Sequence, residues 1–277
     1  MQVQHQFQCG KYQLILNRPH VMGIVNVTPD SFSDGGQFAS TDLAVEHALQ
    51  LILEGADVLD IGGESTRPGA TPVSLEEELS RVIPVIEALT KVATVPISID
   101  TYKPEVMRQA IVAGADIVND VRALQETGAL EVVAKSNVGV CLMHMQGTPQ
   151  TMQIEPHYND VVEEVKQFLI ERLNATTHAG ISKERVLLDP GFGFGKRTLH
   201  NIALIQNLEK LAEIGQPLLV GLSRKSVLGA IAGSDAEQRL YAGLAANVIS
   251  VMKGAKIVRV HDVKATVDAL KIVTAIQ

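Results

Sequence analysis

The segment His20–Val27 reads HVMGIVNV, an apolar run that meets a polar residue, Asn26, near its end. Seven further runs rich in Val, Ile and Leu follow it, at Val58–Ile61, Ile97–Asp100, Ile117–Asn119, Val138–Met143, Val186–Asp189, Leu218–Leu222 and Ile257–Val260. Runs that are apolar throughout are typical of parallel strands whose two faces are both covered by helices. The sequence therefore predicts eight buried parallel strands.

Segments with helical spacing of apolar residues separate the predicted strands. They lie at about residues 41–55, 75–91, 104–113, 127–135, 158–178, 200–213, 236–252 and 263–275. Two of them carry start signals, because Ser74 and Glu77 have the spacing of a capping box and Pro104 suits a first helical turn. Strands and helices thus alternate along the whole chain.

Eight β–α units in about 250 residues match the repeat number and length of a (β/α)8 barrel. The alternative is a doubly wound open sheet, but no GxGxxG motif follows the first strand and no linker divides the chain. We therefore expect an α/β fold, a (β/α)8 TIM barrel formed by residues 1–277 as a single domain. The segment before residue 18 is expected to form an N-terminal hairpin that closes the bottom of the barrel.

The composition excludes several broad classes of protein. Of 277 residues, 46% are hydrophobic and 20% are charged, which excludes a disordered chain. The 24 Lys and Arg residues against 31 Asp and Glu residues give a net charge of −7, the wrong sign for a general nucleic-acid binder. No apolar run approaches the roughly 20 residues of a membrane span, and Cys9 and Cys141 form no CxxC pair. We expect a soluble cytoplasmic protein.

Polar side chains follow the predicted strands at the end where (β/α)8 barrels carry their functional residues. They are Asn26, Asp100, Asn119, His144, Asp189, the segment Ser223–Ser226, Arg259 and His261. A single one, such as His144, could simply form a hydrogen bond at the barrel mouth. Together, converging side chains of this kind would form one polar pocket, which predicts a small-molecule site.

Cationic and hydroxyl side chains gather after the last two predicted strands. Ser223–Ser226 includes Arg224 and Lys225, and Arg259 and His261 follow at the eighth strand. The corresponding loops of many (β/α)8 barrels hold a phosphate, so we expect an anionic ligand there. The alternative is that Arg224 and Lys225 are solvated and that Arg259 pairs with a carboxylate of the barrel.

The sequence argues against a zinc site and leaves a magnesium site open. No HxxxH or HExxH pair is present and neither cysteine has a metal-site neighbour, so a zinc site built by the protein is not expected. Mg²⁺ needs only one or two protein oxygens when phosphates and waters complete its shell, and Asn26 could supply one.

Four residues of the predicted mouth suit a flat heterocycle. Asp100, Asn119, Asp189 and Lys225 offer acceptors and donors for a fused ring system with amino and oxo groups, a pterin or a purine. The residue types do not choose between the two. Residues 191–196, GFGFGK, lack the GxxxxGK[ST] spacing of a P-loop and are better explained as a turn that lets the backbone approach the ligand.

Seven motifs carry a resemblance to a known family. They read MGIVNVTPDSFSDGG at 22–36, DIGGESTRPG at 60–69, ISIDT at 97–101, IVND at 117–120, DPGFGFGK at 189–196, GLSRKS at 221–226 and RVHD at 259–262. Over almost its whole length the chain resembles the dihydropteroate synthases of bacterial folate biosynthesis. The resemblance implies a pterin-binding (β/α)8 barrel that condenses 6-hydroxymethyl-7,8-dihydropterin diphosphate with 4-aminobenzoate in the presence of Mg²⁺. It also implies inhibition by sulfonamides and a homodimer.

The resemblance implies roles for individual residues. The pterin would be bound by Asp100, Asn119, Met143, Asp189, Phe194, Gly221, Lys225 and Arg259. The diphosphate would be bound by Asn26, Thr66, Arg259 and His261, with Asn26 also binding the metal. The aminobenzoate and the loops that close over it would involve Phe32, Ser33, Asp34, Thr66, Arg67, Pro68 and Ser226. The catalytic residues would be Asp100, Lys225, Asn26, Arg259 and His261.

The resemblance further implies that the diphosphate leaves the pterin methylene before the amine attacks. Mg²⁺, Arg259 and His261 would stabilise the leaving group, and Asp100 would offset positive charge on the pterin. Two other functions stay open: a pterin barrel that transfers a methyl group to a corrinoid protein, and a non-catalytic homologue that binds a pterin. The first has no need of Ser223–Ser226 or the Thr66–Gly69 loop, and the second would be expected to have lost site residues.

Overall fold

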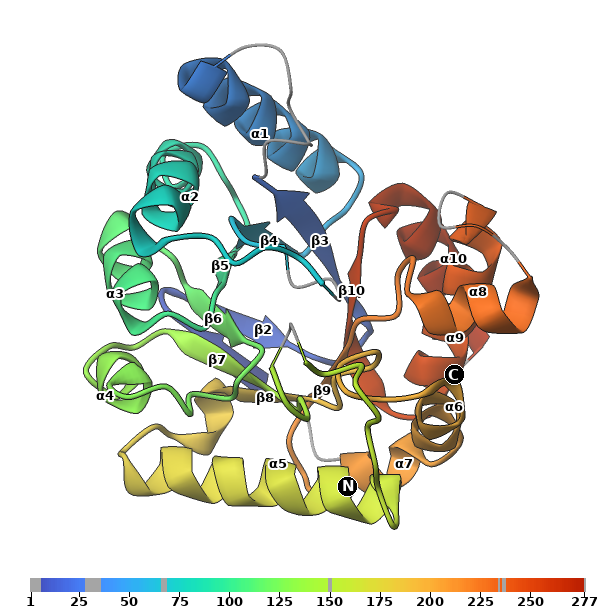
Figure 1. Cartoon of the computed structure of the whole chain (residues 1–277). Coiled ribbons are helices and arrows are strands. Elements are labelled where there is room, and N and C mark those ends of the chain that lie inside the picture. Colours follow the sequence, from blue (N-terminus) through green and yellow to red (C-terminus); the bar gives the residue numbers. More distant parts are fainter. Residues whose placement is uncertain are drawn as a thin grey trace.

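Eight parallel strands form a closed barrel in the part of the chain that the structure describes (Figure 1). The structure is a computed structural model, and it describes residues 6–27, 36–65, 69–148, 151–233, 235 and 238–276. The strands are β3 (His20–Asn26), β4 (Val58–Gly62), β5 (Ile97–Asp100), β6 (Ile117–Asp120), β7 (Gly139–Met143), β8 (Val186–Asp189), β9 (Leu218–Val220) and β10 (Ala255–Val260). They follow one another in chain order, and β10 pairs with β3 to close the ring. The predicted (β/α)8 barrel is confirmed.

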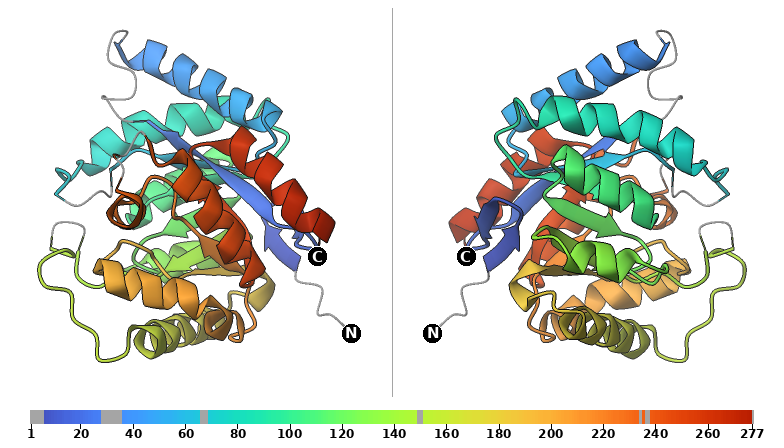
Figure 2. Two further views of the ribbon diagram at one scale, coloured as in Figure 1. Left: turned by 90° about the vertical axis from the view of Figure 1, so that its right-hand side faces the viewer. Right: turned by 90° about the vertical axis from the view of Figure 1, so that its left-hand side faces the viewer.

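Helices surround the barrel wall, as Figures 1 and 2 show. They are α1 (Gly36–Leu53), α2 (Leu75–Leu89), α3 (Pro104–Ala113), α4 (Ala129–Ala134), α5 (Val161–His178), α6 (Thr198–Gln206), α7 (Leu208–Ala212), α8 (Ser226–Ala232), α9 (Leu240–Met252) and α10 (Val263–Ile276). Ser74 caps α2 by accepting a hydrogen bond from Glu77 N at 3.1 Å. Pro104 is the first residue of α3. Both start signals in the sequence are therefore confirmed.

Two helical segments differ from the sequence prediction. The predicted helix at 200–213 is divided into α6 and α7 at Asn207, whose φ of −113° and ψ of 23° depart from helical values. The sequence pattern does not predict α8, because seven residues are too few for a periodic apolar signal. Gly229 within α8 leaves room for the Arg239 guanidinium, which a Cβ at this position would meet at 2.5 Å.

The direction of the side chains divides the barrel interior into layers. An apolar layer near the N-terminal ends of the strands contains one residue from each of seven strands, Met22, Val58, Ile117, Cys141, Leu187, Leu219 and Ile257. Because successive side chains of a strand point to opposite faces, the residue two positions further on points into the barrel again. Those residues include Asp60, Asn119, Asp189 and Arg259. The fold thus places a polar layer above an apolar floor.

A two-stranded hairpin closes the bottom of the barrel, as the sequence predicts. β1 (Gln6–Cys9) pairs antiparallel with β2 (Tyr12–Ile15), and Phe7 and Cys9 are buried in the same cluster as the apolar layer. Gly139 at the start of β7 permits this contact, because a Cβ there would lie 2.5 Å from the Phe7 ring. Figure 2 shows the hairpin at the end of the barrel remote from the loops that follow the strands.

The outer faces of the strands pack against the helices. Val25, Ile61, Ile99, Val118 and Leu188 belong to one buried cluster with apolar residues of the surrounding helices. Burial of both strand faces explains why the strands read as continuous apolar runs in the sequence. None of the described helices is long and apolar enough to cross a membrane.

Candidate active site

The polar layer at the C-terminal ends of the strands forms the candidate site. Strand pairing brings Asn26 on β3, Gly62 on β4, Asp100 on β5 and Asn119 on β6 into register with one another. A Cβ on Gly62 would lie 3.8 Å from both Asn26 Oδ1 and Asp100 Oδ2, so this glycine leaves space between the two side chains. The structure therefore brings together the predicted residues of these neighbouring strands.

Arg259 on β10 joins two carboxylates of this layer. Its Nε donates to Asp60 Oδ2 at 2.5 Å, and its Nη2 donates to Asp100 Oδ2 at 2.6 Å. Asn119 Nδ2 donates to the same Asp60 oxygen at 3.0 Å. Asp60 is fully buried, and its other oxygen, Oδ1, has no hydrogen-bond partner among the described residues. The pairing of Arg259 with barrel carboxylates, the alternative considered for this residue from the sequence, is thus present in the structure.

Lys225 reaches the polar layer from the loop after β9. It immediately precedes helix α8, its Nζ donates to Phe192 O, and the same nitrogen lies 4.5 Å from the centre of the Phe194 ring. Burial lowers the pKa of Lys225 to about 8, and the carboxylates of Asp189 and Asp100 oppose this effect. Lys225 is therefore part of the site and not a solvated side chain.

The other residues after β9 and β10 contact one another across the two strand ends. Arg224 is half-exposed and pairs with Asp262, with 2.8 Å between Nη2 and Oδ1. Ser223 Oγ lies 3.0 Å from His261 Nδ1 and accepts a hydrogen bond from His261 N at 3.2 Å. Ser226 is the first residue of α8. Of the predicted cations, Arg224 alone matches the solvated alternative, because Lys225 and Arg259 both lie in the polar layer.

Burial raises the pKa values of two carboxyl groups in the layer. The pKa of Asp100 is raised to about 7 by burial and by the nearby charge of Asp60, although Arg259 opposes the shift. Burial also raises the pKa of Asp189, which Lys225 and a hydrogen bond from Gly191 N at 2.7 Å oppose. The layer thus contains three acidic residues, Asp60, Asp100 and Asp189, and two cationic ones, Arg259 and Lys225. It therefore suits a ligand that donates hydrogen bonds.

Three further residues predicted to contact the pterin lie at the same end of the barrel. Met143 ends β7 and is 4% exposed. Gly221 follows β9, and a Cβ there would lie 3.8 Å from Arg259 Cβ. Phe194 lies beside Lys225 in the turn after β8. All eight residues predicted to bind the pterin are therefore described, and they come from β5, β6, β7, β8 and β10 and from the segments after β8 and β9.

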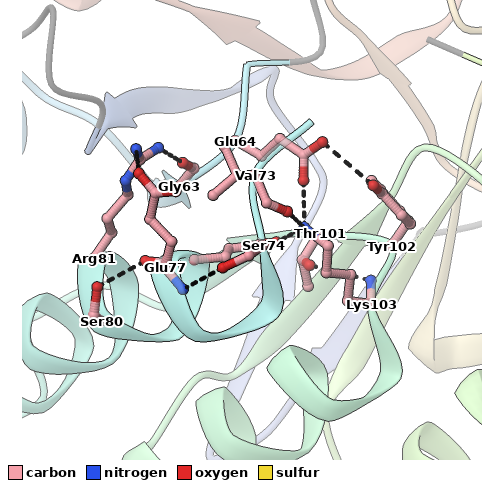
Figure 3. A network of polar contacts seen from close by, with 11 residues as sticks. Gly63, Glu64, Val73, Ser74, Glu77, Ser80, Arg81, Thr101, Tyr102 and Lys103 are labelled. Atoms are coloured by element: carbon pink, nitrogen blue, oxygen red, sulfur yellow. Dashed lines mark hydrogen bonds and ion pairs between the residues drawn. The ribbon is translucent and has the colours of Figure 1, made fainter. Parts of the chain in front are cut away.

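Six predicted residues, Phe32, Ser33, Asp34, Thr66, Arg67 and Pro68, lie outside the described residues. The chain on both sides of 66–68 is described, and Lys103 binds both sides (Figure 3). Its Nζ donates to Glu64 Oε2 at 2.5 Å and to Val73 O at 2.8 Å. A third hydrogen bond, to Glu78 Oε2 on α2, also measures 2.5 Å. Lys103 therefore fixes the two ends of the segment that contains Thr66–Pro68.

Comparisons with known proteins match this arrangement. The family model described as "Pterin binding enzyme" matches residues 22–261. The dihydropteroate synthase of Escherichia coli K12 is 55% identical over 262 residues, which cover 95% of this chain and 93% of the relative. That of Neisseria meningitidis serogroup B is 53% identical over 275 residues, covering 97% and 96%. The chain belongs to the dihydropteroate synthase family.

Solved structures of the dihydropteroate synthase family have the same barrel. The Xanthomonas albilineans enzyme with 4-aminobenzoic acid has a TM-score of 0.94 at 54% identity, covering 99% of both chains. The Burkholderia cenocepacia enzyme complexed with 7,8-dihydropteroate has a TM-score of 0.90 at 50% identity, covering 100% of this chain and 98% of that chain. The Yersinia pestis enzyme in a sulfonamide drug complex has a TM-score of 0.93 at 49% identity, covering 98% of both. These relatives support the synthase and neither of the other two functions considered from the sequence.

Two residues of this dihydropteroate synthase site escape the sequence analysis. Asp60 lies two positions after Val58 of the apolar layer, so strand alternation points it into the barrel. This alternation is the sequence signal that could have predicted Asp60 as a residue of the barrel interior. Lys103 is the third residue after Asp100, and no sequence signal links it to Glu64 or Val73. His144, predicted at the barrel mouth, forms a hydrogen bond with the buried Lys196 instead of joining the polar layer.

Proposed function

We propose that this protein condenses 6-hydroxymethyl-7,8-dihydropterin diphosphate with 4-aminobenzoate to give 7,8-dihydropteroate and pyrophosphate. The observation that carries the proposal is the polar layer. In it Arg259 contacts Asp100 at 2.6 Å, and the turn after β8 binds both Lys225, through Phe192 O, and Asp189, through Gly191 N. The 55% identity to the synthase of E. coli supports the same reaction. Relatives solved with 4-aminobenzoic acid and with 7,8-dihydropteroate support the proposed second substrate and the proposed product.

The pterin would bind with its amino and N–H edge toward the carboxylates. An ionised Asp189 can accept two N–H bonds, Asn119 offers a donor and an acceptor in one plane, and Lys225 can donate to a ring oxygen. Arg259 shares Asp100 Oδ2 in this structure. We expect Arg259 to leave that oxygen when the pterin binds and to turn toward the diphosphate.

The chemistry requires one bond to break and one to form. The bond between the pterin methylene carbon and the diphosphate oxygen breaks, and the oxygen keeps both electrons. The nitrogen of 4-aminobenzoate then forms the new bond to carbon and gives up one proton, which the released pyrophosphate or water accepts. Asp100 would offset positive charge on the pterin, while Arg259 and His261 would stabilise the departing negative charge.

We propose that Mg²⁺ binds at Asn26. The residues fit, because Asn26 Oδ1 and Asp100 Oδ2 flank Gly62, each 3.8 Å from its Cβ position, and Mg²⁺ prefers oxygen ligands. Among the described residues no group of three His, Cys, Asp or Glu side chains is arranged to hold a metal ion, so waters and diphosphate oxygens would complete the shell. The bound ion would supply positive charge to the diphosphate.

The second substrate would bind above the pterin. We propose that Phe32, Ser33, Asp34, Arg67 and Pro68 form its site with Ser226 at the start of α8, and that Thr66 contacts the diphosphate. The hydrogen bonds of Lys103 to Glu64 and Val73 support this site, because they bind the described chain on both sides of residues 66–68 to one side chain. Sulfonamides, which resemble 4-aminobenzoate, would compete for the same place.

We propose that the protein is a homodimer formed through α9. Tyr241, Ala245, Ile249 and Met252 are exposed, and their spacing places them along one face of the helix. Tyr241 is 80% exposed and Met252 59% exposed, so a continuous apolar stripe lies on the barrel's outer wall. A second copy of the chain would cover it. We further propose a cytoplasmic protein, which the two unpaired buried thiols of Cys9 and Cys141 support.

The test of the proposed function is pyrophosphate release by the purified protein with dihydropterin diphosphate and Mg²⁺. We expect release to require 4-aminobenzoate and to be inhibited competitively by a sulfonamide. Folded protein that binds the pterin in calorimetry but releases no pyrophosphate would contradict the proposal. A methylated tetrahydropterin and a corrinoid acceptor, supplied in the same assay, would then test methyl transfer.

A further inference from the structure

A buried lysine, Lys196, binds the turn that follows β8. Lys196 is 2% exposed, and its Nζ lies 2.8 Å from His144 Nδ1, 2.8 Å from Gly191 O, 3.0 Å from Phe194 O and 3.3 Å from His144 O. An ammonium group has three N–H donors, and these four acceptors are enough to satisfy all of them. None of the four belongs to a carboxylate. The proposed reaction assigns Lys196 no part.

The turn of residues 191–195 is fixed from several directions. Each of its carbonyl oxygens accepts a hydrogen bond, from Lys196 to Gly191 and Phe194, from Lys225 to Phe192, from Gln153 to Gly193 and from Tyr158 to Gly195. The turn also lies against the chain after β7, because a Cβ on Gly191 would be 1.9 Å from His144 O. The positive φ of 66° at Gly191 adds a second reason for glycine there.

This turn connects Lys196 with Lys225 and Asp189, two of the residues predicted to bind the pterin. Phe192 O accepts a hydrogen bond from Lys225, whose ammonium also lies over the Phe194 ring at 4.5 Å. Gly191 N donates to Asp189 Oδ1 at 2.7 Å. Lys196 therefore binds Gly191 O and Phe194 O in the same turn whose Phe192 O accepts from Lys225 and whose Gly191 N donates to Asp189.

We propose that Lys196 is a positioning residue for the predicted pterin site. It binds the turn of residues 191–195 to His144, so that Lys225 and Asp189 point at the ligand. The inference rests on the proposed function, since it assumes that these two residues bind the pterin. Lys196 itself touches neither substrate. It acts through the carbonyl groups of Gly191 and Phe194.

The charges around the turn agree with this role. Burial and the neighbouring Lys196 lower the pKa of His144 to about 2, so the imidazole stays neutral and can accept a hydrogen bond. Burial lowers the pKa of Lys196, and the negative charge of Asp189 opposes this. Three cations act on Asp189, namely Lys225, Lys196 and Arg259. Loss of the Lys196 charge would therefore raise the pKa of Asp189 further.

Four variants test the proposal. Lys196→Met keeps the length of the side chain without its donors. His144→Asn keeps an acceptor near the place of Nδ1, whereas His144→Leu removes it. Lys253→Met is the matched control. Lys253 also donates to a backbone carbonyl, that of Gln206 at 3.1 Å, but Gln206 ends helix α6 on the outside of the barrel. Each variant is compared with the wild type by calorimetry with dihydropterin diphosphate alone and by steady-state kinetics.

We expect Lys196→Met and His144→Leu to raise the pterin Kd about tenfold or more, the effect of one misplaced hydrogen bond, while kcat changes less than about threefold. His144→Asn and Lys253→Met should keep the wild-type Kd. In Lys196→Met, the acid limb of the pH profile of kcat/KM for the pterin should move to higher pH, because Asp189 is more easily protonated. A purely structural role would lower the melting temperature without this shift.

Two results would overturn the proposal. One is a folded Lys196→Met protein with a wild-type pterin Kd. The other is an equal Kd for His144→Asn and His144→Leu, which decides the question even if Lys196→Met does not fold. Failure of the proposed function would be recognised separately, because the wild-type protein would then release no pyrophosphate in response to 4-aminobenzoate.

Discussion

At the scale of single residues, Asp60 shows how a buried carboxylate organises its neighbours. One of its oxygens accepts hydrogen bonds from both Arg259 and Asn119, and the other has no partner among the described residues. A buried charge is costly unless donors and an opposite charge compensate it. Asp60 therefore orients two residues predicted to bind the pterin without being assigned to the ligand itself.

Asp60→Asn removes the charge and keeps the shape of the side chain. We expect it to raise the pterin Kd about tenfold, because hydrogen bonds to charged groups contribute about 1.5–3 kcal/mol. Calorimetry with the pterin substrate measures this directly. The matched control is Asp57→Asn, which weakens an ion pair with the half-exposed Arg18. A wild-type Kd for Asp60→Asn would show that Arg259 and Asn119 keep their places without it.

The pKa of Asp100, raised to about 7 chiefly by burial, predicts a pH dependence. Below that pH the carboxyl group becomes neutral and can no longer offset positive charge on the pterin. We expect kcat to fall by up to about tenfold for each pH unit below the pKa. Asp100→Asn should lose this limb and depress turnover more than pterin binding. An Asp100→Asn enzyme with intact kcat and weakened binding would reduce Asp100 to a binding residue.

At the scale of elements, the sequence predicts those strands and helices that have a clear local pattern of apolar residues. All eight barrel strands follow from apolar runs such as Ile97–Asp100, because each strand is buried on both faces. Helix α8 does not follow, since it has seven residues and a glycine. The break at Asn207 between α6 and α7 is also hidden, because both pieces carry apolar residues at helical spacing.

Lys103 links two elements, and its loss should affect one substrate more than the other. The hydrogen bonds of Lys103 hold the ends of the segment 64–73, in which Thr66–Pro68 are predicted to contact the diphosphate and aminobenzoate. We expect Lys103→Met to raise KM for 4-aminobenzoate about tenfold, while the pterin Kd in calorimetry changes little.

The control for Lys103→Met is Lys135→Met. Lys135 pairs with Glu131 on α4 and is 74% exposed, so its loss should change neither constant. Glu64→Gln should give a smaller change of the same kind as Lys103→Met, since the amide still accepts a hydrogen bond. Equal increases in the two constants for Lys103→Met would indicate a general loss of structure instead.

At the scale of the whole molecule, the exposed stripe on α9 predicts an oligomer. Ile249→Asp places a charge among Tyr241, Ala245 and Met252 and should convert a dimer into monomers in sedimentation experiments. Val112→Asp is the control, because Val112 is 79% exposed on α3, away from α9 (Figure 1). Wild-type protein that sediments as a monomer would exclude the proposed dimer.

The site as a whole could be predicted only in part. The residue types and their places after the strands are enough to predict that Asp100, Asn119, Asp189 and Lys225 lie at the same end of the barrel, where the structure has them. The sequence does not show which hydrogen bonds and ion pairs hold these residues in place, because those contacts join residues that are far apart in the chain. Arg259 and Asp60 are separated by 199 positions, and Lys196 and His144 by 52. Such contacts depend on closure of the barrel, which local patterns do not encode.

Among the described residues, the apolar floor and the hairpin close the N-terminal end of the barrel below the polar layer. Phe7 of the hairpin and Met22 of the floor are both fully buried, so the described part of the chain leaves no path through the bottom of the barrel. On the proposed function, two substrates and two products would then share the opening at the C-terminal ends of the strands. The pterin would bind deeper than 4-aminobenzoate, because the buried Asn119 is among its predicted contacts. The closed floor thus predicts that the pterin enters before 4-aminobenzoate.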